Sequence, residues 1–162
     1  MTPIHRFKHL SQGIILLFVT CLLISCNENT LVDSNKEIEN HNWLYNNKIR
    51  IPVTITDAGK AYNLFMNLRH TANYKYSNIY VIIREIGPDK KTKAVRKEFQ
   101  LAYPDGQWLG KGSGNLYSYQ FQIFKNHHFS QKGNYLIEFE QNMRDNPLRE
   151  VSDIGLKVVP TN

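Results

Sequence analysis

Apolar and polar residues alternate along most of this chain from Trp43 onward, and this period of two limits the fold more than any other feature. In segment 49–55 every odd position is apolar, and segments 62–68, 117–123, 135–139 and 154–158 alternate in the same way. Successive side chains of a strand point to opposite faces, so each segment has one face for a core and one for water. Segment 79–86 is apolar on both faces, which is typical of a central strand.

Turn-forming residues separate these segments, as in Asp57-Ala58-Gly59, Gly87-Pro88-Asp89 and Pro104-Asp105-Gly106. Short strands without a long helical period predict an all-β fold, a two-sheet antiparallel β-sandwich of the Ig-like or jelly-roll-like kind. Pro52 has no N–H for a ladder, so its strand should lie at a sheet edge or turn that nitrogen outward. Tyr135, after Gly133-Asn134, is placed like the tyrosine corner of such sandwiches.

The N-terminus has the layout of a secretory signal: the basic residues Arg6 and Lys8, then an apolar run over 14–24, then Ser25-Cys26. This run is too short for a transmembrane helix, which needs about 20 residues. Leu23-Ile24-Ser25-Cys26 reads as a lipobox, which predicts cleavage between Ser25 and Cys26 and lipidation of Cys26. The alternative is a soluble secreted protein in which Cys26 is an ordinary thiol.

These features divide the chain into a signal peptide over 1–25, a lipidated cysteine with a polar flexible tether over 26–41, and a sandwich domain over 42–160. The second cysteine, Cys21, leaves with the signal, so no disulfide can form within the mature chain. The remaining 137 residues suffice for one domain with its own core. We expect no cofactor beyond the covalent lipid.

The chain has a net charge of +6, which falls to +4 once the signal is removed. Nucleic acid is excluded as a partner by export, whereas acidic headgroups or an acidic protein surface would suit this charge. Simple solubility is the more ordinary explanation. The basic hairpin formed by residues 90–97 has the same two interpretations, a charged edge that resists strand pairing or a contact with acidic partners.

No catalytic constellation stands out. Gly112-Ser113-Gly114 lacks the spacing of a nucleophile elbow. His127 and His128 are adjacent and would point to opposite faces of a strand, so no metal site is predicted there. The carboxylates are scattered along the sequence. We therefore expect a protein that is not an enzyme.

Aromatic residues in or beside loops are the candidate ligand or partner surface, because exposed aromatic rings stack on sugars and anchor protein interfaces. The alternative is that they cap the open ends of the sandwich. The residues are Trp43, Tyr74, Tyr76, Tyr103 and Trp108.

Several motifs resemble the gliding-motility lipoprotein GldH family of Bacteroidetes, in the same order and behind the same type of lipobox. They are Asp57-x-x-Lys60-Ala61-Tyr62 through Arg69, Asn73-Tyr74-Lys75-Tyr76-Ser77-Asn78, Pro104-Asp105-Gly106-Gln107-Trp108-Leu109-Gly110, Gln141-x-Met143-Arg144 and Val151-x-Asp153-Ile154-Gly155. These motifs add Asp105 and Arg144 to the candidate surface.

The resemblance implies a non-enzymatic cell-envelope lipoprotein that works beside the gliding motility and type IX secretion apparatus and binds protein partners. A partner would use one sandwich face or the loop over 104–115. The alternative is a glycan-binding envelope module that uses the loop aromatics. We expect an outer membrane lipoprotein that faces the periplasm; the residues after Cys26 carry one acid, Glu28, and surface display is the alternative.

Overall fold

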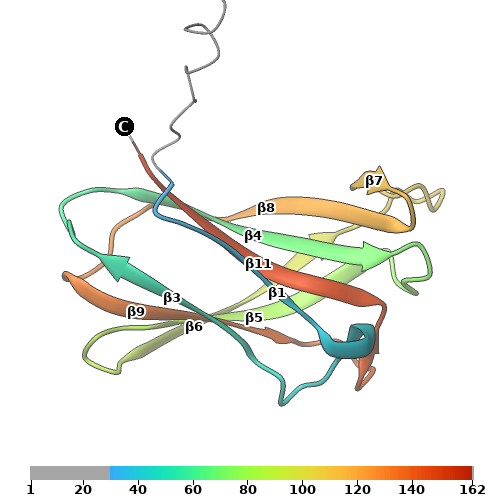
Figure 1. Ribbon diagram of the computed structural model, residues 1–162, viewed down its shortest axis with the longest axis horizontal. Coiled ribbons are helices and arrows are strands. Elements are labelled where there is room, and N and C mark those ends of the chain that lie inside the picture. Colours follow the sequence, from blue (N-terminus) through green and yellow to red (C-terminus); the bar gives the residue numbers. More distant parts are fainter. Residues whose placement is uncertain (1–29, 162) are drawn as a thin grey trace, which may run out of the picture.

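The computed structural model describes residues 30–161, and they fold into two packed antiparallel sheets with their connecting loops (Figure 1). The five-stranded sheet has the order β1 (Val32–Glu37), β11 (Val151–Pro160), β4 (Tyr62–Thr71), β8 (Leu116–His127) and β7 (Lys111–Ser113). The four-stranded sheet has the order β3 (Ile49–Ile55), β9 (Gly133–Gln141), β5 (Asn78–Ile86) and β6 (Thr92–Gln100). A short 3₁₀ turn η1 (Glu39–His41) leads to β2 (Asn42–Trp43), which pairs with β10 (Leu148–Arg149).

The predicted two-sheet sandwich is therefore confirmed, and its topology is that of a jelly roll. In chain order the long strands β1, β4, β8 and β11 enter one sheet, while β3, β5, β6 and β9 enter the other. This order gives the sheets β1-β11-β4-β8 and β3-β9-β5-β6, the strand arrangement of an eight-stranded jelly roll. Every strand lies within 32–160, so this part of the chain contains the whole core described here.

The apolar side chains of the alternating segments fill the space between the sheets. On β4 the core face carries Tyr62, Leu64, Met66 and Leu68, all of them buried. Side chains of the other strands meet them from both sheets and form one continuous apolar cluster. Burying a side chain of this size stabilises the fold by about 1.5–3 kcal/mol each, which makes the cluster the main source of stability in a domain without a disulfide.

Three detailed expectations about the strands are also confirmed. Pro52 lies on β3, an edge strand of the four-stranded sheet. The two-faced apolar segment is β5, which pairs on one side with β6 and on the other with β9. The Tyr135 hydroxyl donates to the carbonyl oxygen of Gln131 at 2.9 Å and accepts from its N–H at 3.1 Å, as a tyrosine corner does.

The prediction of a flexible tether over 26–41 is wrong for the second half of that segment. Residues 32–37 form β1, which pairs with β11 from Val32↔Val158 to Glu37↔Asp153, and the buried Ile38 belongs to the core. The folded domain thus begins ten residues earlier than the predicted boundary at 42. The signal peptide and Cys26 lie outside the described residues.

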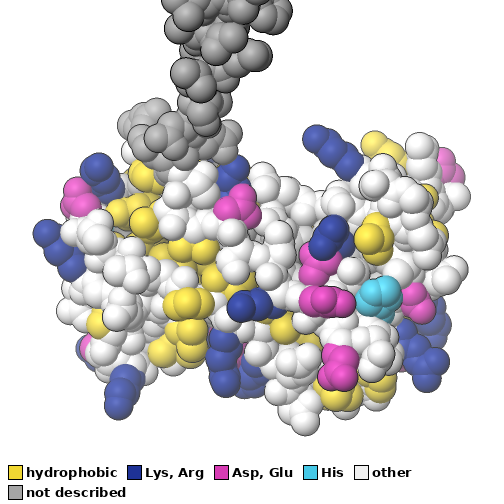
Figure 2. All heavy atoms as spheres, viewed as in Figure 1, with side chains coloured by type: hydrophobic (Ala, Val, Ile, Leu, Met, Phe, Trp, Pro, Cys, Tyr) yellow, Lys and Arg dark blue, Asp and Glu magenta, His cyan; other side chains and the backbone are white. Residues whose placement is uncertain are grey.

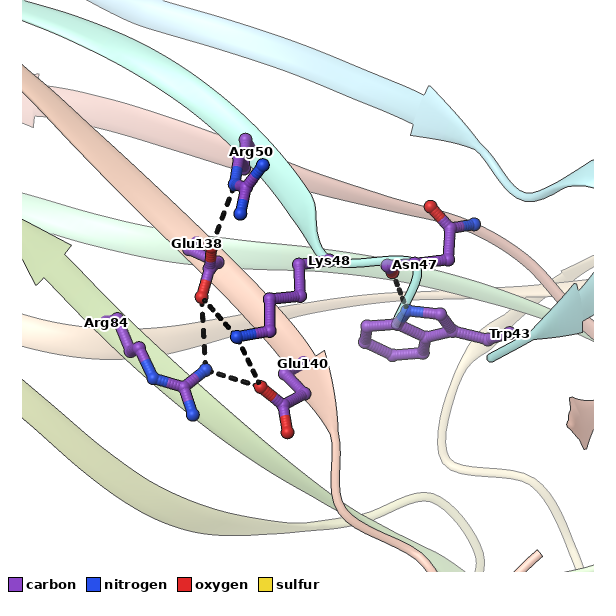
Figure 3. A network of polar contacts seen from close by, with 7 residues as sticks. All are labelled: Trp43, Asn47, Lys48, Arg50, Arg84, Glu138 and Glu140. Carbon is purple, nitrogen blue, oxygen red and sulfur yellow. Dashed lines mark hydrogen bonds and ion pairs between the residues drawn. The ribbon is translucent and has the colours of Figure 1, made fainter. Parts of the chain in front are cut away.

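Charged side chains cover the outer face of the four-stranded sheet as a connected network (Figure 3). The register places Glu138 of β9 directly opposite Arg50 of β3 and Arg84 of β5. Its carboxylate lies 2.8 Å from Arg50 Nε, 3.1 Å from Arg84 Nη1 and 3.4 Å from Lys48 Nζ. Glu140 closes the network through Lys48 at 3.3 Å and Arg84 at 2.6 Å. Because these cations lie over Glu138, its side chain is only 3% exposed.

Burial alone would raise the pKa of Glu138, and it is the largest single influence on that group. The hydrogen bond from Arg50 and the charges of Lys48 and Arg50 together outweigh it, so the pKa is lowered from its usual value. Glu138 is therefore ionised at neutral pH, and the charge network on this face is intact.

The outer face of the five-stranded sheet carries a row of side-chain amides. Gln120 of β8 donates to Asn67 of β4 at 3.0 Å, and Asn67 donates to Asn35 of β1 at 3.3 Å. The row crosses β11 at Gly155, where a Cβ atom would lie 1.8 Å from the Asn35 side-chain oxygen. Gly155 is thus required for β1 to approach, and a groove of about 800 Å³ runs over this row.

Surface charges are mostly interspersed rather than gathered by sign. On the side of the molecule shown in Figure 2, hydrophobic side chains gather in the left half and acidic and basic side chains mix in the right half. In the basic hairpin, Lys91 pairs with Asp89 at 3.1 Å, and Arg96 donates to Asn142 at 2.6 Å and lies over the Tyr80 ring. These contacts favour the interpretation of a charged edge strand.

Candidate functional site

The candidate residues come from four loops that meet at one end of the sandwich, on the right in Figure 1. These loops follow β4, β6 and β9, or precede β3, so the antiparallel order of the strands brings them to the same end. The sequence placed the candidates in separate loops. The fold gathers them, and this loop end is therefore the candidate functional site.

The Pro-Asp-Gly-x-Trp-Leu-Gly motif forms a small hairpin at this end. Tyr103 and Gln107 close it through the Tyr103 N–H and Gln107 carbonyl at 2.8 Å, and Ala102 bridges to Trp108. Asp105 accepts from the N–H of Gln107 at 3.0 Å, and Gly106 has a φ of 90°, which suits glycine. The turn therefore projects its tip into solvent and directs Trp108 back to the domain.

Trp108 packs against a buried histidine, His70, with a ring separation of 4.5 Å. His70 Nδ1 lies 2.7 Å from the carbonyl oxygen of Thr71, which can only accept, so the neutral ring carries its proton there. Nε2 lies 3.0 Å from the Tyr119 hydroxyl, which donates to the Leu101 carbonyl at 2.8 Å. Burial lowers the pKa of His70, although its hydrogen bond to Thr71 opposes this, and burial raises the pKa of Tyr119 to about 12. The pair is uncharged at neutral pH.

The loop after β9 is held by side chains from three other parts of the chain. Buried Gln141 donates to the Asp145 carbonyl at 3.0 Å and accepts from the Met143 N–H at 2.8 Å. Tyr76 donates to the Asp145 carboxylate at 2.6 Å, and this hydrogen bond is the main reason that the pKa of Asp145 is lowered. Tyr45 donates to the Met143 carbonyl at 2.6 Å. The loop is thus fixed by specific hydrogen bonds.

A pocket of about 630 Å³ opens beside this loop. Its polar lining includes three basic side chains, Lys75, Arg144 and Arg149, and two acidic ones, Asp145 and Glu150. Arg144 is exposed. The loop end thus offers charges of both signs, together with the exposed tip of the hairpin.

Two members of the predicted surface are corrected by their burial. Trp43 is fully buried, with its indole N–H donating to the Asn47 carbonyl at 2.8 Å (Figure 3), and Tyr74 is 4% exposed and packs against His70 at 4.9 Å. Both cap the end of the core, as the alternative interpretation held. Tyr103 is 50% exposed, and Asp105 is exposed beside it. Trp108 and Tyr76 are partly buried.

His70, Gln141 and Tyr45 were missed by reasoning from the sequence alone. For His70 a signal exists, because the alternation of β4 continues through position 70 and places the ring on the core face. Gln141 continues the core face of β9 in the same way. For Tyr45 no signal exists, since its partner lies 98 residues away in the sequence.

His127 lies beside a buried carboxylate. Its Nε2 is 2.6 Å from Glu85 without forming a hydrogen bond of good geometry, and Lys93 Nζ is 3.9 Å from the same carboxylate. Over residues 30–161 no three histidine, cysteine or acidic side chains are grouped as metal ligands. Over the same residues, no helix is both long and apolar enough to cross a membrane.

Comparison with known proteins decides the family. The model of the GldH lipoprotein family matches residues 30–158, which is nearly all of the described domain. The chain belongs to the GldH lipoprotein family. It is 28% identical over 151 residues to a gliding motility lipoprotein GldH homolog of Christiangramia forsetii, covering 89% of this chain and 92% of that protein. It is equally similar to the gliding motility lipoprotein GldH of Flavobacterium johnsoniae, covering 89% and 93%.

Membership in the GldH family makes this chain a membrane-anchored envelope lipoprotein of the gliding motility system, and not an enzyme. The resemblance first noted from the motifs is thereby confirmed. The family match begins at residue 30, close to the start of β1. The match therefore includes β1, which the predicted domain boundary at 42 left out.

Solved structures offer a looser likeness. A carbohydrate-binding module specific for non-crystalline cellulose superposes with a TM-score of 0.44 at 8% identity, covering 80% of this chain and 73% of that one. A β-fructofuranosidase from Schwanniomyces occidentalis superposes with a TM-score of 0.43 at 10% identity, covering 83% and 34%. Likenesses at this level carry no argument about ligands.

Proposed function

We propose that this GldH-family lipoprotein is an accessory component of the gliding motility and type IX secretion apparatus, and that it binds protein partners of that apparatus. Family membership over residues 30–158 is the observation that carries the proposal. The loop end supplies the contact surface. Its exposed residues Tyr103, Asp105 and Arg144 are presented by loops that hydrogen bonds hold in place, so little ordering is needed on binding.

The test is a set of chromosomal variants that leave the core untouched. Tyr103→Ala, Asp105→Ala and Arg144→Ala should together impair surface spreading and the export of type IX substrates, because they remove an exposed aromatic anchor and two charges. Matched controls lie in turns at the opposite end, at Lys60 and Lys132. Equal protein levels on a blot exclude misfolding. Normal spreading and export by the loop-end triple variant would contradict the proposed surface.

The lipid anchor is the second part of the proposal. We expect the mature protein to begin at lipidated Cys26 and to sit on the periplasmic face of the outer membrane. Fractionation should place it in the outer membrane, and protease added to intact cells should leave the domain uncut. Digestion in intact cells would reverse the assigned side while leaving the role in motility unaffected.

The glycan-binding alternative loses its structural basis at the loops. An aromatic platform for sugars needs exposed ring faces, yet Trp43 and Tyr74 are buried and Trp108 packs on His70. Tyr103 alone among the five predicted aromatics is at least half exposed. We therefore place protein binding first.

A further inference from the structure

One edge of the five-stranded sheet ends abruptly. β7 pairs with β8 only from Lys111↔Ser118 to Ser113↔Leu116. Beyond that point, within residues 30–161, β8 has β4 on one side and no strand on the other from Tyr119 to its end at His127. Backbone donors and acceptors along an unpaired edge are a template for another strand. At about 3.3 Å per residue, the eight residues 119–126 offer roughly 26 Å of edge.

The other three sheet edges carry features that discourage strand pairing. β1 has Asp33, Lys36 and Glu37, β3 has Pro52, and β6 has Lys93, Arg96 and Lys97. Charges and proline are the usual means by which proteins protect an edge. β8 differs in its central part, because no charged residue occurs between Lys111 and Lys125, and Lys125 near its end is the one lysine in 119–126. The run Tyr119-Gln120-Phe121-Gln122-Ile123-Phe124 has strong β propensity, which left uncovered is an aggregation hazard.

The local structure leaves room for an added strand. Gln120 and Gln122 are exposed, and Phe121 and Phe124 are partly so. The groove of about 800 Å³ reaches this edge, where it is lined by Leu109, Gly110, Lys111, Tyr119, Gln120 and Phe121. The carbonyl oxygen of Ile123 is bound by the Lys97 ammonium of the opposite sheet. The Lys97 side chain thus binds a backbone carbonyl oxygen that a neighbouring strand could otherwise bind.

The charges around the edge indicate what kind of segment fits. Lys97, Lys111 and Lys125 surround it. A second copy of this chain paired edge to edge would bring six such lysines together, which like-charge repulsion opposes. A segment with acidic residues at its ends is complementary to them. All strand pairs in this sheet are antiparallel, which favours the same direction for an added strand.

We propose that the free edge of β8, residues 119–126, receives an extended segment of a protein partner by β-strand addition, antiparallel to β8 and in line with β7. The segment carries acidic residues that face Lys111 and Lys125. Main-chain hydrogen bonds give the affinity, and alternate side chains lie over the groove. The inference rests on the proposed function for the existence of a protein partner, and it assigns that partner a site that adjoins the loop-end hairpin at Leu109 and Gly110.

The experiment uses the full lipidated protein in living cells. A photo-crosslinking amino acid is placed singly at Gln120, Gln122 and Lys125, with Lys36 of β1 and Thr54 of β3 as controls on the protected edges. Mass spectrometry identifies the joined partner residue. The expected result is one contiguous partner segment, in which a step of two residues toward the C-terminus of β8 moves the crosslink about two residues toward the partner's N-terminus.

The captured segment is then synthesised and titrated against a soluble domain of residues 27–162. Reversing the charge of two lysines at the edge, with Lys111→Glu and Lys125→Glu, should weaken binding of the peptide about tenfold at low salt and less at high salt. The matched control, Lys36→Glu with Lys90→Glu, changes the net charge equally and should leave binding within about twofold. Amides of 119–126 should gain protection from hydrogen exchange when the peptide binds.

Several results would overturn the strand-addition proposal: no protein adduct at β8, crosslinks without the antiparallel shift, adducts to a second copy of this chain, or equal weakening by both charge variants. If the same probe placed at Tyr103 or Arg144 still captures motility proteins while β8 captures none, the proposed function stands and the β8 site fails. If no position captures a protein, both fail.

Discussion

Replacing Glu138 by glutamine should destabilise the domain, and the structure gives the size of the effect. Glutamine keeps the volume and one acceptor oxygen but removes the negative charge that Arg50, Arg84 and Lys48 share. It also turns an amide N–H₂ group toward these cations. Both the amide group and the cations are donors, so no hydrogen bond forms between them. The apolar core on the other side of β9 is unchanged, so the measured loss reports the charge network.

The magnitude follows from the exposure of each cation. Arg50 is 59% exposed, so screening by solvent limits its pair with Glu138 to the lower part of the range for surface pairs, about 0.3 kcal/mol. Arg84 and Lys48 are 23% and 33% exposed, and each pair should contribute about 0.5–1 kcal/mol. We expect a total loss of about 1.3–2.3 kcal/mol at pH 7, which lowers the Tm of a domain this size by roughly 5–8 °C.

The dependence on pH provides a second signature. Because the pKa of Glu138 is lowered in the folded state, its contribution is complete above the usual glutamate pKa of 4.5 and is lost as the pH falls through the folded value. The free energies of unfolding of the wild-type and Glu138→Gln domains should therefore differ by a constant amount from pH 6 to pH 8. They should converge below about pH 4.5.

Urea denaturation of the soluble domain, followed by tryptophan fluorescence, measures both quantities. Glu98→Gln on the exposed face of β6 is the matched control and should change the free energy of unfolding by less than about 0.5 kcal/mol. A Glu138→Gln domain as stable as the wild type at pH 7 would refute the reasoning. It would show that the cost of burying the carboxylate offsets all three cations, as happens for some buried ion pairs.

Four further outcomes are expected. Gly155→Ala should lower the free energy of unfolding in urea by about 3 kcal/mol, because its Cβ would lie 1.8 Å from the Asn35 side-chain oxygen and 2.7 Å from the Ser34 carbonyl oxygen. Adding Asn35→Ala should recover only part of this loss, and full stability of Gly155→Ala would contradict the close approach of β1. Leu64→Ala should cost about 2–5 kcal/mol, since Leu64 is fully buried between the sheets, and a loss below about 1 kcal/mol would place it outside the core. The pKa of His70 is lowered by burial, so the free energy of unfolding should fall as the pH drops below about 6.5, and His70→Gln should flatten that slope; an equal slope in both would assign it to other groups. Cys26→Ala should accumulate as an unprocessed precursor that takes up no labelled fatty acid, and normal labelling would remove Cys26 as the lipid site.

The sequence was sufficient for the parts of the fold in which side-chain pattern and burial coincide. Strands β3 and β4 bury mainly one face, so their period of two predicts them directly. Strands β9 and β11 keep the same apolar alternation in sequence, although positions on their other face are buried as well. β1 escaped this reasoning for a physical reason. The face that carries Val32 and Ser34 continues with the exposed Lys36, so β1 joins the sheet through backbone pairing with β11 and has no apolar alternation to detect.

The candidate site could be predicted only in part, because a loop sequence does not state which way its aromatic rings turn. Trp43 and Tyr74 fill the end of the core, whereas Tyr103 projects from a turn whose Asp-Gly pair was readable. Glu138 shows a related limit. The alternation of β9 predicts that Glu138 faces solvent. The register places Arg50 and Arg84 directly opposite Glu138, and their side chains cover it.

The correction to the tether changes how the proposed anchor positions the candidate surface. With β1 in the sheet, only the residues between Cys26 and Leu31 separate the lipid from the domain, and they can span at most about 17 Å, compared with roughly 50 Å for a tether over 26–41. The chain enters β1 opposite the end of β11, at Val32↔Val158, whereas the loop end lies at the other end of the same strands. Strands of ten residues such as β4 and β11 extend about 33 Å. Lipidation at Cys26 would thus hold the sandwich close to the bilayer, with Tyr103 and Arg144 at the end far from the anchor and the free edge of β8 along its flank. An anchored protein in this arrangement can contact one partner at its tip and bind an extended segment along its side.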